Sequence, residues 1–370
     1  MAPPKKTGKS KAKKRSFHQE LVLNRWVMRF FKGNELAALK LRLGDDLHEG
    51  VDDDGQTLFF HELTRNLFEV DWISEADLRR YDLHIVEHWQ DITKHRNQLE
   101  GHVLNMKYFQ YLSLLFTEIY LDWYFNKPQA LLDGLNEELK RYSKEKGAEI
   151  FQPYIASDLN KIAFWNATGS GKTLLLHVNI KQYLHYFQMG NSSLFPDKII
   201  LLTPNEGLSK QHLEELELSG FSFSRFFDKN RTNTFNGTID IIDINKLGDS
   251  MGDKTVAVEA FEGNNLVLVD EGHRGTGTKA GTWMQRRDVL VRGGFAFEYS
   301  ATFGQAVAKG HTVAKAEEDI RKKKAKTLFE TAALNKLDDA QKAQLTLTQE
   351  EQRQARVTAI REIYAKCILF

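Results

Sequence analysis

The chain has 370 residues, enough for two or three domains of ordinary size. With 41% hydrophobic residues, 27% charged residues and only 6 prolines, it has the composition of a globular protein, which excludes a disordered or collagen-like chain. The single cysteine, Cys367, excludes a disulfide framework and any site built from several cysteines. Such cysteine usage is typical of a reducing compartment, and we expect a cytoplasmic protein.

The formal net charge of +1 is unevenly distributed. The first fifteen residues hold seven Lys or Arg and no acid, so we expect 1–16 to be a disordered basic tail. This tail either contacts a polyanion or serves solubility alone. The rest of the chain has a small excess of acids, so any contact with nucleic acid must come from local patches.

The segment 17–100 shows helical apolar spacing and predicts a helix-rich accessory domain. Its acidic stretch 50–56 predicts a solvated turn rather than a calcium loop, because Gly50 and His61 would fall at the first and last ligand positions. His84 and His88 stand at the H-x-x-E-H spacing of some zinc peptidases. No third ligand stands at a diagnostic spacing, so a polar helix face is the favoured interpretation.

The apolar stretch 103–125 has almost the length of a membrane span. Lys107, Glu118 and Asp122 interrupt it, and each would cost about 2.5–3.5 kcal/mol in the bilayer centre. We therefore predict a buried helix and no membrane association.

Five short apolar runs follow, separated by helical segments: KIAFWNA, DKIILLTP, TIDIIDI, NLVLVDE and FAFEYSA. The runs are continuous rather than alternating, which indicates strands covered on both faces. The alternation of strand and helix predicts an α/β domain with a parallel, doubly wound sheet over 101–305. The segment 306–370 is rich in Lys, Glu, Gln and Ala and predicts a charged helical extension. The apolar ending suggests that a further strand begins there.

Residues 166–173 read NATGSGKT between a predicted strand and a predicted helix, which is the context of a phosphate-binding loop. Asn166 replaces the first glycine of the full pattern, but two glycines remain to make the turn. We expect Lys172 to reach the β- and γ-phosphates of ATP and the Thr173 hydroxyl to bind Mg²⁺. The candidate nucleotide-binding residues of the loop are Thr168, Gly169, Ser170, Gly171, Lys172 and Thr173.

A second motif places two carboxylates after the apolar run 266–269. Ligands of open α/β sheets bind at the carboxyl ends of strands, so Asp270 and Glu271 are candidates for the same site. Asp270 would hold Mg²⁺, and Glu271 would orient and deprotonate the attacking water.

ATGSGKT, DEGH and the YSAT of 299–302 resemble, in order and spacing, motifs I, II and III of superfamily 2 helicases. The closest likeness is to the ATPase subunits of type III restriction enzymes and related phage-defence helicases. The resemblance implies a RecA-like fold, ATP and Mg²⁺ as cofactors, and movement along nucleic acid. It also implies that His273, Ser300 and Thr302 couple nucleotide state to the grip on nucleic acid.

Other segments extend the resemblance. The segment 203–205 looks like motif Ia and 245–247 like a neighbouring contact motif, so the candidate nucleic-acid contacts are Thr203, Pro204, Asn205 and Lys246. Gln110 ends a segment similar to the R-x-Y-Q segment that reads adenine, with Tyr108 or Phe109 as the stacking partner. Gln110 is equally consistent with an ordinary helix residue.

The resemblance covers about 101–304, one RecA-like domain. The sequence contains no Q-x-x-G-R-x-x-R arginine-finger pattern, so a second RecA-like domain, in cis or in trans, would have to supply it. We therefore expect the first half of a DNA translocase or helicase motor, poorly active as an isolated chain.

Double-stranded DNA is the favoured partner, and a restriction or phage-defence system, with a methyltransferase or other subunits, is the favoured setting. The alternative is an ATP-binding interaction module without turnover of its own. An unrelated P-loop ATPase or kinase is disfavoured by the joint presence of DEGH and SAT.

Overall fold

The protein is described by a computed structural model that covers residues 21–31, 36–67, 73–146, 153–190, 193–228, 236–248, 256–257, 261, 263–271, 287, 289–303 and 313–358. The predicted basic tail, the apolar ending, Cys367 and His273 lie outside these described residues.

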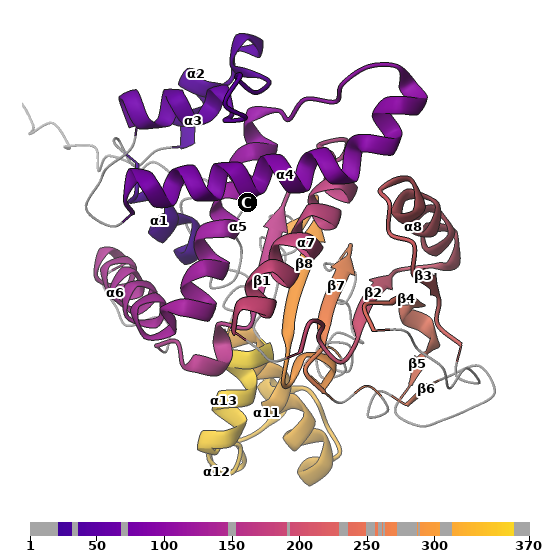
Figure 1. The fold of residues 1–370 in the computed structure, drawn as a ribbon. Coiled ribbons are helices and arrows are strands. Elements are labelled where there is room, and N and C mark those ends of the chain that lie inside the picture. Colours follow the sequence, from indigo (N-terminus) through magenta and orange to yellow (C-terminus); the bar gives the residue numbers. More distant parts are fainter. Residues whose placement is uncertain are drawn as a thin grey trace, which may run out of the picture.

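A six-stranded sheet forms the centre of the structure (Figure 1), in the order β1-β8-β7-β2-β4-β3 with every neighbouring pair parallel. Its strands are β1 (Lys161–Trp165), β2 (Ile199–Thr203), β3 (Ser224–Phe226), β4 (Ile239–Asp243), β7 (Leu266–Asp270) and β8 (Phe295–Ser300). A separate parallel pair is formed by β5 (Leu247–Gly248) and β6 (Val256–Ala257). The five predicted strands and their parallel arrangement are confirmed, whereas β3, β5 and β6 are too short to be detected from an apolar run.

The sheet is covered on both faces, as its continuous apolar strands require. Alternate residues of one strand enter different cores: Leu201 belongs to a large cluster with α5 and α7, and Ile200 to a smaller cluster with Phe261 and Leu290. The large cluster also includes residues of α1 to α4, so the amino-terminal helices and the sheet share one hydrophobic core.

In the described part of the chain, six helices precede the sheet: α1 (Val22–Met28), α2 (Leu36–Leu43), α3 (Leu58–Glu62), α4 (Glu75–Glu100), α5 (Tyr108–Asn126) and α6 (Pro128–Lys146). The others are α7 (Lys172–Gly190), α8 (Glu206–Leu218), α11 (Val313–Phe329), α12 (Asp339–Ala343) and α13 (Gln349–Thr358). Short 3₁₀ turns span Asp46–His48, Ala156–Asp158, Ile244–Lys246 and Leu334–Lys336, and a π-helical turn spans Leu63–Leu67. In Figure 1, α4 crosses the upper part of the molecule beneath α2 and α3, while α11, α12 and α13 gather at the bottom.

The long helix α4 has a clear signal at each end. The Ser74 hydroxyl accepts the Asp77 N–H, and Gly101 ends the helix in the left-handed conformation, with φ of 71°. Between these ends α4 packs on α5, α7 and α8, and thereby joins the amino-terminal helices to those beside the sheet.

Helix α5 is buried, as predicted, and its acids have partners. Tyr186 donates its hydroxyl to Glu118 over 2.6 Å, and Tyr81 donates to Asp122 over 2.5 Å. These hydrogen bonds offset part of the cost of removing two carboxylates from water. Within the described residues, no helix has the length and apolar character needed to cross a membrane.

The backbones of Gly294 and Asn265 approach closely just before β8, and a substitution can test this contact. A Cβ atom on Gly294 would lie 1.9 Å from the backbone oxygen of Asn265, which accepts the N–H of Phe295. Since backbone atoms in a sheet cannot move aside, Gly294→Ala should lower the free energy of unfolding by about 3 kcal/mol. The control is Gly190→Ala, where the added carbon meets only Phe125 at 3.9 Å and the change should stay within about 0.5 kcal/mol. Urea denaturation followed by circular dichroism measures both, and equal stabilities would contradict the close approach of the two backbones.

Candidate nucleotide-binding site

The segments singled out by their sequence follow five adjacent strands of one parallel sheet. The phosphate-binding loop follows β1, the SAT segment ends β8, the DE pair ends β7, and 203–205 and 245–246 follow β2 and β4. Because the strands are parallel, all five segments lie at the same edge, where open α/β sheets bind ligands.

The loop 166–171 has the backbone of a phosphate cradle. Gly169 and Gly171 have φ of 78° and 79°, in the left-handed region that glycine adopts without strain. Ser170 donates its N–H to the Ala167 oxygen over 3.2 Å, which closes the turn before α7 begins at Lys172. The amino end of this 19-residue helix carries a partial positive charge that favours anions.

Two further observations fit a bound phosphate. The Ser170 hydroxyl oxygen is buried and has no hydrogen-bond partner among the described residues. At Gly169 a Cβ atom would meet no atom within 4 Å, so there is open space beside the loop. A buried polar group without a partner is costly unless a ligand or water satisfies it. The loop therefore suits the phosphates of a nucleotide, and Thr173 and Asp270 have the oxygen donors that Mg²⁺ prefers.

Lys172 and Glu271 are 99 positions apart in sequence, yet they meet at this edge. Lys172 Nζ lies 3.3 Å from Glu271 Oε1, and the two side chains are 16% and 23% exposed. This ion pair brings the lysine of the loop directly to the predicted base. The three candidate catalytic residues, Lys172, Asp270 and Glu271, thus gather in one place.

Asp270 has a neighbour that the sequence did not reveal. His212, on α8, places Nε2 3.0 Å from Asp270 Oδ2, while the N–H of Glu271 donates to Oδ1 over 3.0 Å. Burial alone would raise the pKa of Asp270. The hydrogen bond and charge of His212, together with Lys172, outweigh that effect and hold the pKa below its ordinary value. Asp270 is therefore an anion at neutral pH.

Glu271 has an unusual backbone conformation. Its φ is 55°, in the left-handed region, where a residue with a side chain costs about 1–3 kcal/mol. Such strain persists when surrounding structure enforces it, and it clusters at functional sites. At this position it turns the chain immediately after β7.

The SAT segment contacts the phosphate-binding loop through the backbone. Asn166 donates its N–H to the Ser300 oxygen over 3.2 Å, and the Trp165 indole donates to the Ala301 oxygen over 3.1 Å. The Ser300 hydroxyl is buried and accepts the Thr302 N–H over 3.0 Å. The coupling roles of Ser300 and Thr302 stay predictions, but their segment is connected to the loop.

The two expected nucleic-acid segments also touch each other. Asn245 donates its amide to the Pro204 oxygen over 3.3 Å. Asn205 and Lys246 are exposed, whereas the Thr203 hydroxyl is buried and lies 2.6 Å from that of Ser209. Any contact that Thr203 makes with nucleic acid would thus have to use something other than its hydroxyl.

Gln110 lies against the phosphate-binding loop. Its Nε2 donates to the Ser170 oxygen over 3.0 Å, and its Oε1 accepts the Lys107 N–H at the start of α5 over 2.9 Å. Both ends of the amide therefore bond to backbone. Adenine reading by Gln110 stays a prediction, and the structure adds a direct contact between its amide and the phosphate-binding loop.

The calcium-loop and zinc-site alternatives, at 50–61 and at His84 and His88, can both be compared with the structure. Asp52 is used inside its own turn, where it accepts the N–H groups of Asp54 and Gln56 and lies 2.6 Å from His61. His84 has a ring neighbour from α7, His185, at 4.2 Å between centroids. No group of three or more His, Cys, Asp or Glu within the described ranges could hold a metal ion.

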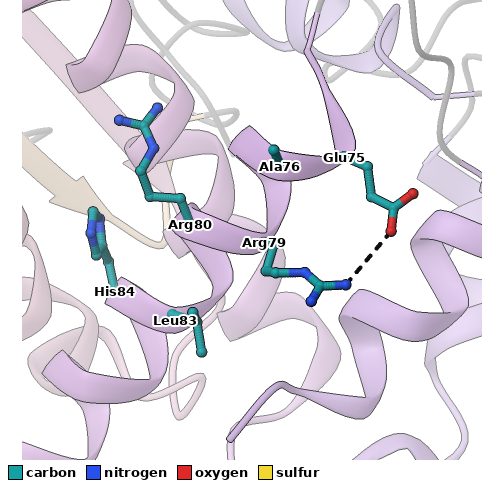
Figure 2. A pocket seen from close by; sticks show the side chains of 6 residues that line it. All are labelled: Glu75, Ala76, Arg79, Arg80, Leu83 and His84. Carbon is teal, nitrogen blue, oxygen red and sulfur yellow. Dashed lines mark ion pairs between the residues drawn. The ribbon is translucent and has the colours of Figure 1, made fainter. Parts of the chain in front are cut away.

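A surface pocket of about 550 Å³ lies on α4 and is lined by Glu75, Ala76, Arg79, Arg80, Leu83 and His84, none of which belongs to the nucleotide-binding motifs. Figure 2 shows Arg79 turned toward Glu75, 3.7 Å away, and Arg80 directed away from that pair. Arg80 instead bonds to Asp77 and Asp122. The arginines are thus already neutralised, so the pocket is a weak candidate for an anion.

Comparison with known families agrees with the motif geometry. Residues 129–305 match the family model described as "Type III restriction enzyme, res subunit". The match supports a superfamily 2 helicase-like first motor domain over this segment. The resemblance stated from the motifs is confirmed for that part of the chain, and with it the RecA-like α/β fold. No curated protein matches the chain.

The contact between Gln110 and the phosphate-binding loop makes the role of Gln110 testable. If its amide supports the loop, Gln110→Glu should weaken ATP and GTP binding to a similar extent, because the lost Nε2 donor holds a loop common to both. The expected loss is about 3–10-fold, the worth of one hydrogen bond. Isothermal titration with each nucleotide measures it, with Gln129→Glu at an exposed position of α6 as the control. A loss confined to ATP would show that Gln110 reads the base instead.

Proposed function

We propose that this chain is the first half of an ATP-dependent translocase or helicase motor that acts on nucleic acid. The observation that carries the proposal is the meeting of Lys172 with Glu271, beside Asp270, at the edge of a parallel sheet. The match to the restriction-enzyme family supports a motor of the helicase class.

In this proposal different groups of the chain bind the phosphates, bind the metal ion and take the proton of the attacking water. The loop backbone and Lys172 hold the phosphates, and Thr173 and Asp270 hold Mg²⁺, which neutralises phosphate charge when bound. Glu271 orients the attacking water and takes its proton. Asp270 is partly buried, and the left-handed φ of Glu271 sets the direction in which the chain leaves β7.

We propose that nucleic acid binds at the same edge, across the segments after β2 and β4. Asn205 and Lys246 are exposed there, and their segments are joined by the hydrogen bond from Asn245 to Pro204. Double-stranded DNA within a restriction or phage-defence system is the favoured partner, on the strength of the family's description. Methyltransferase or other defence subunits belong to the same proposal.

The finer proposal includes a second RecA-like domain, in cis or in trans, that supplies an arginine finger. Loss of such an arginine costs about 10³–10⁵ in turnover in related phosphate-transfer enzymes. The 370-residue chain by itself should therefore hydrolyse ATP slowly. The alternative, an ATP-binding module without turnover, would share the loop geometry and differ in hydrolysis when the partner domain is present.

Lys172→Ala tests nucleotide binding. The change removes the positive charge that meets the phosphates, so affinity for Mg²⁺–ATP should fall at least about 100-fold by isothermal titration while the unfolding midpoint changes little. Lys181→Ala is the control, because Lys181 lies on the same helix and pairs with Asp91 rather than with the loop. Equal affinities of Lys172→Ala and the unmodified chain would refute the assignment of the loop.

Glu271→Gln tests the proposed base. The amide keeps the size of the side chain and Asp270 is intact, so ATP binding should remain. Hydrolysis should fall about 10²–10⁴-fold in single-turnover measurements with nucleic acid and the partner domain present. Glu206→Gln, on the exposed start of α8, serves as the control. Hydrolysis at the unmodified rate would exclude Glu271 as the base and favour another group.

A further inference from the structure

His212 contacts the carboxylate that the proposed function assigns to Mg²⁺. We infer that His212 is a positioning residue: it fixes the orientation of Asp270 and ties the metal site to α8, the helix that begins at the expected nucleic-acid segment. The inference rests on the proposed function and goes beyond it, because neither the motifs nor the family match assigns a role to His212.

The contact is well defined and largely shielded from water. The side chains of His212 and Asp270 are 6% and 13% exposed, and Nε2 lies 3.0 Å from Oδ2. A carboxylate can only accept, so Nε2 carries the proton. With the Glu271 N–H on the other oxygen, both oxygens of Asp270 have a donor, and rotation of the carboxylate is restricted.

The hydrogen bond to Asp270 is the principal polar contact of His212, because the other ring nitrogen, Nδ1, does not share in it. Nδ1 is buried and has no hydrogen-bond partner among the described residues. A histidine that only filled space between helix and sheet could be replaced by an apolar residue without leaving a polar atom unpaired. The hydrogen bond from Nε2 to Asp270 is a contact that no apolar residue at this position could make.

Helix α8 connects His212 to the segment after β2, because the helix begins directly after Asn205. Asn205 accepts the Leu208 N–H and so begins the helix, and the Ser209 hydroxyl meets Thr203. His212 lies about two turns later on the same rigid element. A displacement of Asn205 by nucleic acid would therefore move the donor that holds Asp270.

At its other end, α8 is connected to the amino-terminal helices. Arg96 of α4 donates to Glu215 of α8 over 2.6 Å, about one turn beyond His212. The position of His212 thus depends on contacts at both ends of α8. A shift of α8 would therefore move His212 and change the hydrogen bond that orients Asp270.

The expected effect follows from the behaviour of groups behind a metal ligand. Removing a donor that orients a metal-bound side chain costs about 10–100-fold in metal affinity. His212→Ala should therefore weaken Mg²⁺ binding at the nucleotide site by that factor. Affinity for ATP in excess EDTA should be unchanged, because the loop and Lys172 are untouched.

Two amide variants separate hydrogen bonding from packing. In His212→Gln the amide nitrogen can take the place of Nε2 and should restore most of the Mg²⁺ affinity. In His212→Asn the amide nitrogen falls at the position of Nδ1 and cannot reach Asp270. The loss of Mg²⁺ affinity should therefore remain. Lys210→Ala, exposed on α8 and paired with Glu206, is the control for the helix itself.

The readouts are direct Mn²⁺ binding by electron paramagnetic resonance and the Mg²⁺ dependence of binding of a fluorescent ATP analogue, both on the full chain. Unmodified Mg²⁺ affinity in His212→Ala would overturn the inference. So would a Gln variant as defective as the Asn variant. If the unmodified chain bound no nucleotide, the proposed function would fail first, which distinguishes the two failures.

Discussion

The parallel register of the central sheet is the constraint on which the site depends. Strands β1, β8, β7, β2 and β4 are adjacent and point the same way, so the segments that follow them meet at one edge. Trp165 pairs with Ser300, and Asp270 pairs with Tyr299, so the ends are also level. The apolar residues that bury the sheet on both faces thereby fix where the polar residues stand.

Much of this arrangement could be predicted from the sequence, because its signals are local. Continuous apolar runs identify strands covered on both faces, and two glycines before a lysine and a threonine identify the loop. The carboxylates after β7 follow from their place at the end of such a run. Strand order required the structure, since β8 lies between β1 and β7 although it is the last of these strands in the chain.

The unpredicted part of the site consists of contacts between residues far apart in sequence. His212 and Asp270 are 58 positions apart, and Gln110 and Ser170 are 60 apart. A histidine on a polar helix carries no local sign that it faces a carboxylate. The positive φ of Glu271 was equally hidden, because glutamate is not a residue that favours that conformation.

The pair formed by Lys172 and Glu271 has a consequence for how a nucleotide arrives. The lysine already pairs with an anion, so a phosphate that binds Lys172 competes with Glu271 for the ammonium group. Binding under the proposed function is thus an exchange of one negative partner for another. Under the proposed function, the same exchange would separate Glu271 from Lys172 when the nucleotide binds, which is the state in which a base is needed.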